Sequence, residues 1–194
     1  METILKYFPN LTEKQRTQLT LLRGVYEEWN SKINVISRKD IGNLYEHHVL
    51  HSMAIAKFFP FKENTKVMDL GTGGGFPGIP LAILYPKCQF HLVDSIGKKI
   101  RVAEAVARAI DLHNVKLSHT RGEEVHDQYD FVVTRATMRI PELIKCVRKN
   151  THNILALKGE EYYEAKDVRC EIYDLNEVFE GEFFETKKLI HIQC

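Results

Sequence analysis

Asp69-Leu-Gly-Thr-Gly-Gly-Gly-Phe-Pro-Gly78 joins an apolar run at residues 66–70 to a helical pattern that starts at Gly78. Glycine lacks a Cβ, so such a loop can adopt positive φ angles and let a ligand approach the main chain closely. In an open α/β sheet, a loop of this kind lies at the carboxyl end of its strand, where ligands bind. The stretch therefore predicts a strand, a ligand-binding loop and a helix.

Apolar runs and helical patterns alternate after the loop. Further apolar runs that are typical of buried strands lie at 89–94, 115–118, 129–134 and 153–157. Helical patterns lie at 78–85, 98–111 and 141–149. Two last strands, at 171–180 and 187–193, follow without an intervening helix, so we expect an antiparallel hairpin that turns around Gly181. The whole pattern predicts a Rossmann-like, doubly wound α/β sheet of seven mostly parallel strands.

The first sixty residues carry helical signals and no strand signals. Apolar residues recur at steps of three and four between Leu19 and Trp29, and either Asn10 or Thr12 suits the N-cap of that helix. A polar linker at 31–40 leads to a second helical stretch, 44–59, which Pro60 ends. We therefore expect an N-terminal helical extension at 1–60 and the α/β domain at 61–194.

Two acidic residues discriminate among the ligands that a glycine loop can hold. Asp94 ends the second strand, where a carboxylate can accept hydrogen bonds from both hydroxyls of a ribose. Asp69 precedes the glycines and would repel a pyrophosphate, whereas the ammonium and sulfonium of S-adenosylmethionine tolerate a nearby negative charge. Asp69 could instead cap N–H groups of the loop. The pair favours S-adenosylmethionine as cofactor.

Charge is distributed unevenly along the chain. The net charge is +1, but residues 95–121 hold six Lys and Arg against two acids, and residues 135–158 hold six against one. A fold that gathers both segments on one face would attract phosphates, as RNA-binding proteins do. Ordinary solvated helix faces are the alternative explanation.

The remaining composition bears on compartment and cofactors. The four cysteines lack CxxC spacing, and no apolar stretch is long enough to cross a membrane, so we expect a cytoplasmic protein without a membrane anchor. His47 and His51 have the i, i+4 spacing of zinc ligands, but no third ligand is evident and no Glu follows the first His, so we expect no metal.

Seven ordered blocks of sequence resemble the small-subunit ribosomal RNA guanine-N7 methyltransferases, the glucose-inhibited division protein B family. The blocks are Trp29-Asn30 with Asn34 and Ser37, His48–Ser52, Asp69–Pro80, Leu92–Lys99, Arg121–Glu124, Thr134–Ala136 and Leu155–Gly159. The resemblance implies a class I S-adenosylmethionine-dependent methyltransferase that acts on N7 of a guanine in 16S ribosomal RNA, free or within the small subunit. We expect it to act as a monomer.

The resemblance and the residue chemistry together give a set of expected site residues. The residues expected to bind the cofactor are Asp69, Gly71, Gly73, Phe76, Asp94, Gly122, Glu123 and Arg135. Arg135 is also the expected catalytic residue, at the methyl-donor end, unless it forms a salt bridge with Glu123 or Asp94. The residues assigned to the RNA are Arg38, His48, Lys98, Lys99, Arg101 and Lys158.

Two other functions stay open at the level of sequence. The spacing of Gly73, Gly75 and Gly78 also fits GxGxxG, which permits a nicotinamide-dependent oxidoreductase. Asp69 and the lack of a sizeable substrate domain count against that reading. A non-catalytic RNA-binding assembly factor on the same fold is the second alternative, since fold alone does not fix function.

Overall fold

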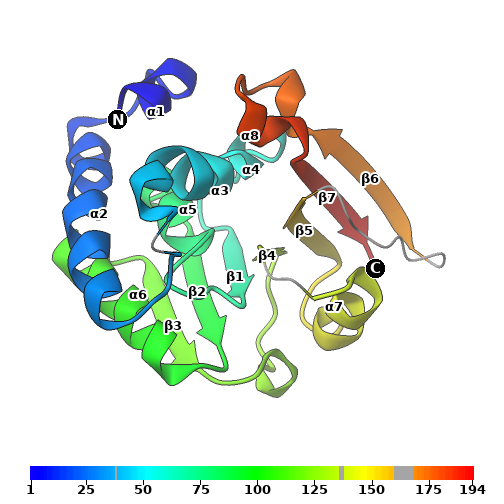
Figure 1. Ribbon diagram of the computed structural model, residues 1–194. Helices are drawn as coiled ribbons and strands as arrows, with labels where there is room; N and C mark the ends of the chain where they lie inside the picture. The colour runs from blue at the N-terminus through cyan, green and yellow to red at the C-terminus, as the bar shows by residue number, and fades with distance from the viewer. Residues whose placement is uncertain (38, 136–137, 160–167) are drawn as a thin grey trace.

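A seven-stranded sheet organises the chain in a computed structural model, which describes residues 1–37, 39–135, 138–159 and 168–194. The strand order is β3-β2-β1-β4-β5-β7-β6 (Figure 1). Strands β1 to β5 are parallel, and β7 is antiparallel to both of its neighbours. The strands are Lys66–Leu70 (β1), Gln89–Asp94 (β2), Val115–His119 (β3), Phe131–Thr134 (β4), Asn153–Lys158 (β5), Arg169–Asp174 (β6) and Lys188–Gln193 (β7). The predicted α/β sheet with an antiparallel C-terminal pair is confirmed.

Two hydrophobic clusters cover the two faces of the sheet. Successive strand residues point to opposite faces, and in β1 Val67 joins one cluster while Met68 joins the other. The first cluster contains residues of α5 (Gly78–Leu84), α6 (Gly97–Ala109) and the N-terminal helices. The second cluster contains residues of α7 (Ile140–Val147), which is therefore on the opposite face from α6.

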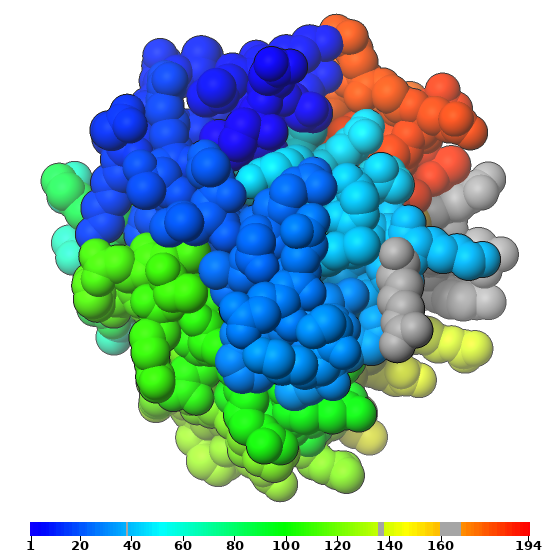
Figure 2. Space-filling view, turned by 60° about the vertical axis from the view of Figure 1, so that its left-hand side comes forward, coloured from blue at the N-terminus to red at the C-terminus, as the bar shows by residue number. Residues whose placement is uncertain are grey.

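The N-terminal helices share the first of these clusters with the sheet. They are α1 (Glu2–Tyr7), α2 (Glu13–Lys32), the 3-10 turn η1 (Ile41–Asn43), the π-helix η2 (Leu44–Leu50), α3 (His51–Met53) and α4 (Ile55–Phe58). Of the two candidate N-caps, Thr12 is the one used, in a capping box with Gln15. Figure 2 shows residues of this segment, coloured blue to cyan, covering much of one side of the molecule.

The connection between the last two strands differs from the predicted hairpin turn. Strand β6 ends at Asp174, and a 3-10 turn, η4 (Leu175–Glu177), and a helix, α8 (Glu182–Glu185), precede β7. The expectation of no intervening helix was wrong because this connection buries Phe179 and Phe184 in the cluster shared with the N-terminal helices. The Phe179 ring meets the Tyr7 ring edge-on, with 4.8 Å between the ring centres, and it stacks on the Phe184 ring at 4.9 Å.

The two basic segments do not gather on one face of the sheet. Their helices, α6 and α7, pack on opposite faces. Both helices begin at the carboxyl edge of the parallel strands, since α6 follows β2 and α7 follows β4. What the segments share is that edge. Of the helices in the described residues, none has both the length and the apolar composition that a bilayer span requires.

Gly24 lies in the exposed middle of α2, and a Cβ added there would meet no atom within 4 Å. Glycine in a helix interior costs about 0.5–1 kcal/mol relative to alanine. We expect Gly24→Ala to raise the free energy of unfolding by about that amount, measured by urea denaturation. A lower value would show that α2 is strained at this position.

Candidate functional site

A crevice of about 230 Å³ opens at the carboxyl ends of β1 and β2. Four of the residues predicted to bind the cofactor line it: Gly71, Asp94, Gly122 and Glu123. Gly122 begins the 3-10 turn η3 (Gly122–Glu124), and a Cβ there would lie 2.5 Å from Leu70 Cδ1. The fold therefore brings three separate chain segments together around one hollow.

The carboxylate of Asp69 closes the glycine loop on itself. Its Oδ2 accepts hydrogen bonds from the Thr72 hydroxyl at 2.6 Å and from the Gly78 N–H at 2.7 Å. The side chain has no exposed surface, and this burial raises the pKa of Asp69 to about 7, against the opposing effect of its donors. Asp69 thus caps the loop, as the sequence allowed. A direct contact between this carboxylate and a ligand requires the loop to move.

Asp94 ties the loop to the second strand. Its Oδ2 accepts from the Gly73 N–H at 2.9 Å, and its Oδ1 accepts from the Ile96 N–H at 2.8 Å. A carboxylate has about four acceptor positions, so each oxygen keeps room for another donor. Because Asp94 also lines the crevice, it can accept hydrogen bonds from a ligand there without giving up the loop.

Helix α2 holds the far side of the loop through Tyr26. The buried hydroxyl of Tyr26 donates to the Gly74 carbonyl at 2.8 Å, and its ring stacks on Phe76 at 4.9 Å. Phe76 is itself almost fully buried. Its ring belongs to this packing, whereas Gly71, at the start of the loop, lines the crevice. The apolar pattern of residues 19–29 includes Tyr26 but gave no sign of this contact with the loop.

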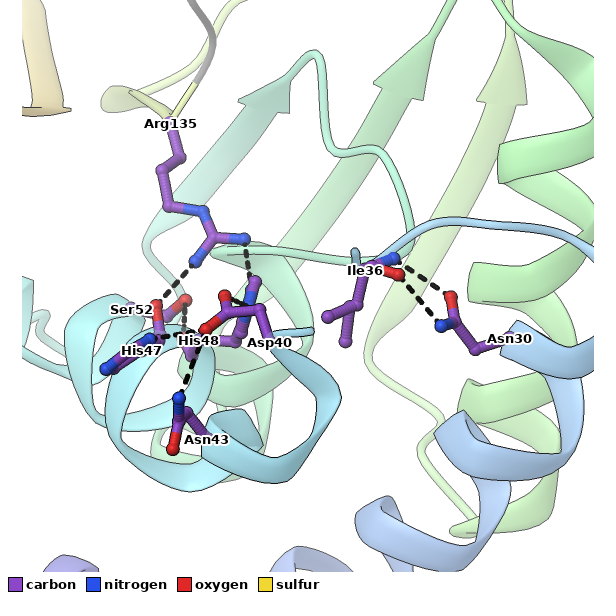
Figure 3. Close-up of polar contacts among 8 residues, drawn as sticks. All are labelled: Asn30, Ile36, Asp40, Asn43, His47, His48, Ser52 and Arg135. Carbon is purple, nitrogen blue, oxygen red and sulfur yellow. Dashed lines mark hydrogen bonds and ion pairs between the residues drawn. The ribbon is translucent and has the colours of Figure 1, made fainter. Parts of the chain in front are cut away.

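Arg135 lies in a partly buried polar cluster behind Phe76. Its guanidinium carbon is 5.0 Å from the centre of the Phe76 ring, and its nitrogens contact the His47 carbonyl at 3.1 Å and His48 Nδ1 at 2.9 Å (Figure 3). Burial lowers the pKa of Arg135 to about 10, although Asp69 opposes this effect. Among the described residues, Arg135 forms no ion pair with Glu123 or Asp94, so that alternative is excluded for this conformation.

Asp40 completes the cluster. Its two carboxylate oxygens contact His47 Nδ1 at 2.5 Å and His48 Nε2 at 2.6 Å. Burial and the nearby Arg135 charge lower the pKa of His48 to about 4, so its imidazole is neutral near neutral pH. The sequence placed Asp40 at the end of a polar linker and gave no sign of these contacts.

The linker reaches the site because Asn30 folds it back onto α2. The Asn30 side chain accepts from the Val35 and Ile36 N–H groups at 2.9 and 3.0 Å and donates to the Ile36 carbonyl at 2.8 Å. Figure 3 shows this clamp beside the Asp40 cluster. Asn30 occurs in one of the sequence blocks that carried the family resemblance, and the clamp gives its physical role.

The basic residues assigned to the RNA are spread along the same edge. Lys98, Lys99 and Arg101 lie in the first turns of α6, with Lys98 and Arg101 exposed. Lys158 ends β5 and donates from Nζ to the Met138 carbonyl at 2.6 Å. Arg38 lies outside the described residues. In the described part of the chain, no group of three or more His, Cys, Asp and Glu side chains is arranged to hold a metal ion.

A family model described as rRNA small subunit methyltransferase G (GidB) matches residues 15–188. The chain belongs to this family. A protein of Bacteroides thetaiotaomicron named Ribosomal RNA small subunit methyltransferase G is 57% identical, and the match covers 100% of both chains. A protein of Flavobacterium johnsoniae with the same name is 49% identical over 99% of this chain and 97% of its own. The resemblance inferred from the sequence blocks is confirmed.

Solved structures support the fold. A S-adenosylmethionine-dependent methyltransferase from Aquifex aeolicus matches with a TM-score of 0.59 at 15% identity, covering 77% of this chain and 92% of that one. MtNAS in complex with MTA and tNA matches with a TM-score of 0.65 at 11% identity, covering 93% and 74%. The sheet is therefore that of the S-adenosylmethionine-dependent methyltransferases, as predicted. The family membership supports the methyltransferase reading over a nicotinamide-dependent oxidoreductase.

Gly78 has no room for a side chain. A Cβ there would lie 2.7 Å from Asp69 Oδ2 and 2.8 Å from Leu92 Cγ. We expect Gly78→Ala to lower the free energy of unfolding by about 1–3 kcal/mol, the usual cost of overpacking a core, measured by urea denaturation. Gly24→Ala is the matched control, with the opposite expected sign. Equal effects at the two sites would contradict the packing seen at the loop.

The pKa of Asp69 gives a pH dependence of stability. Because the folded state raises this pKa from an ordinary value near 4 to about 7, the neutral acid favours folding. That contribution is complete below about pH 4 and is lost as the pH rises to about 7. We expect wild type to lose a few kcal/mol of unfolding free energy relative to Asp69→Asn across this range. Parallel pH profiles of the two proteins would refute the raised pKa.

Proposed function

We propose that this chain transfers the methyl group of S-adenosylmethionine to N7 of a guanine in small-subunit ribosomal RNA. The observation that carries the proposal is the crevice beside Asp94, formed on a methyltransferase sheet in a chain of the rRNA small subunit methyltransferase G family. Relatives that cover the chain from end to end bear that enzyme's name.

The crevice fits the cofactor on chemical grounds. The Asp94 carboxylate faces it with spare acceptor positions, which suits the two hydroxyls of a ribose. Gly122 lines the hollow, and a Cβ there would collide with Leu70 Cδ1 and with Cys146 Sγ, so this position offers a ligand main chain alone, which suits a flat adenine. We assign Gly71, which lines the crevice, and Gly73 to the amino-acid end of the cofactor, and Asp69 to holding their loop in place. When bound, S-adenosylmethionine supplies an electrophilic methyl group on its sulfonium.

The chain's residues position the acceptor base. Guanine N7 carries a lone pair and no proton, so no general base is needed, and alignment can supply several kcal/mol of the barrier. Arg135 directly follows β4, and its guanidinium lies over the Phe76 ring of the glycine loop. A guanidinium bonded to N7 would block its attack, so we assign Arg135 to guanine O6 or to a phosphate.

The RNA backbone is assigned to basic residues at the carboxyl edge of the sheet. Lys98, Lys99 and Arg101 begin α6 there, and Lys158 ends β5. Arg38 keeps its assignment from the sequence. Both ring nitrogens of His48 are engaged within the protein, so its contribution to the RNA site passes through Arg135. The proposed substrate is the ribosomal RNA, either free or within the small subunit. We also propose that the protein acts as a monomer.

The direct test is methyl transfer from tritiated S-adenosylmethionine to small subunits from a strain that lacks this protein, followed by mapping of the labelled base. We expect one labelled guanine, with the methyl group at N7. Binding to the subunits without any transfer would favour the alternative of a non-catalytic assembly factor.

Asp94→Ala tests the cofactor site. Removing a carboxylate that accepts ligand hydroxyls costs about 1.5–3 kcal/mol, so we expect S-adenosylhomocysteine to bind roughly 10- to 100-fold more weakly in calorimetry. Asp111→Ala is the control, because Asp111 follows the far end of α6 and is exposed. The assignment fails if both variants bind as wild type does.

Charge reversal tests the assignment of basic residues at the carboxyl edge of the sheet to the RNA backbone. We expect Lys98→Glu and Arg101→Glu each to weaken RNA binding and to flatten its salt dependence by about one unit of slope per lost phosphate contact. Binding titrations at several salt concentrations measure both effects, with Lys14→Glu on α2 as control. Slopes equal to that of wild type would remove α6 from the RNA interface.

A further inference from the structure

A single carboxylate, that of Asp40, organises the cluster that holds Arg135. Its Oδ1 contacts His47 Nδ1 and its Oδ2 contacts His48 Nε2, at 2.5 and 2.6 Å. The side chain of Asp40 is 31% exposed and that of His48 only 12%. The contacts therefore run inward from the surface: Asp40, then His48, then Arg135 (Figure 3).

The direction of each hydrogen bond follows from the atoms involved. The guanidinium of Arg135 can only donate, so His48 Nδ1, 2.9 Å from its Nη2, must accept and carry no proton. The neutral ring then has its proton on Nε2, which donates to Asp40. A carboxylate can only accept, so Asp40 favours this tautomer over the one that would turn an N–H toward Arg135.

The backbone that presents these histidines is unusual. His47 and His48 lie in the seven-residue π-helix η2, and π-helical turns are rare and concentrate at functional sites. From this segment two consecutive side chains, those of His47 and His48, reach the two oxygens of one carboxylate. The ring of His47 also stacks on Phe183 of α8 at 4.0 Å, which fixes it from the other side.

Contacts with the two histidines and with Phe76 fix the orientation of the Arg135 guanidinium. One guanidinium nitrogen donates to the His47 carbonyl and another to His48 Nδ1, while the Phe76 ring covers its face. Phe76 belongs to the glycine loop, so the same guanidinium borders both the loop and the N-terminal helices. A rotation of the His48 ring would move it.

We propose that Asp40 is a positioning residue for methyl transfer: it fixes the tautomer and orientation of His48, which in turn orients the Arg135 guanidinium beside the glycine loop. The proposal rests on the function proposed above, in which Arg135 orients the acceptor. Asp40 itself touches neither cofactor nor acceptor, and acts only through His48.

The tautomer is measured without any RNA. Long-range ¹H–¹⁵N spectra of the full-length protein distinguish a protonated ring nitrogen from a bare one. We expect His48 to be protonated on Nε2 alone at neutral pH. In Asp40→Asn, the amide can turn its NH₂ toward His48, so a form protonated on Nδ1 should appear. A wild-type ring protonated on Nδ1, or on both nitrogens, would overturn the proposal.

Kinetics test the effect on the reaction. We expect Asp40→Asn to lower kcat on small subunits about tenfold, since small misplacements of a positioning group cost on the order of 10- to 100-fold. Affinity for S-adenosylhomocysteine should stay within about twofold, because the crevice is untouched. Asp111→Asn is the matched control: this exposed aspartate also contacts a histidine, His113, but follows the opposite end of α6. An unchanged kcat in Asp40→Asn would overturn the role.

Two substitutions of His48 separate positioning from folding. The Asn side chain keeps an acceptor where Nδ1 lies, whereas Gln keeps a donor toward Asp40 but offers no acceptor at that place. We expect His48→Asn to retain more kcat than His48→Gln at equal thermal stability. The reverse order, or equal losses that follow the loss of thermal stability, would contradict the chain of contacts. Absence of methyl transfer in wild type would refute the proposed function and leave the tautomer result to stand alone.

Discussion

The hydrogen bonds that Asp69 accepts from Thr72 and Gly78 close the glycine loop, and the geometry of the crevice depends on that closure. Burying a carboxylate without hydrogen bonds costs free energy. Conformations of the loop that take the Thr72 and Gly78 donors away from Asp69 are therefore disfavoured. Asp94 fixes the loop from β2 and Tyr26 fixes it from α2. Strands β1 and β2 and helix α2 thus hold one short segment whose glycines would otherwise allow many backbone conformations.

The same logic makes the first sixty residues part of the site. Tyr26 reaches the loop, Asn30 folds the linker, and Asp40 reaches Arg135 through His48. Helix α2 and its neighbours also share one hydrophobic cluster with α5 and α6. A change in the packing of the N-terminal helices should therefore alter the position of the glycine loop.

The sequence predicted those parts of the fold that local pattern determines. Strands β1 to β5 are short apolar runs, and the glycine loop follows directly from its own residues. The connection at 175–187 was mispredicted because Phe179 and Phe184 are buried by helices from the other end of the chain, a partner that no local window contains. Asp40 was missed for the same reason. Its role exists only once the Asn30 clamp and the π-helix bring it to the histidines.

The strand order β5-β7-β6 has a consequence for how the polypeptide is made. Strand β6 is synthesised before β7, yet the only strand it pairs with is β7, among the described residues. While the chain emerges from a ribosome, β5 presents an unpaired edge and β6 has nothing to join until a later segment arrives between them. The right-hand edge of the sheet in Figure 1 is therefore assembled out of chain order, and nascent protein carries an open edge for that interval.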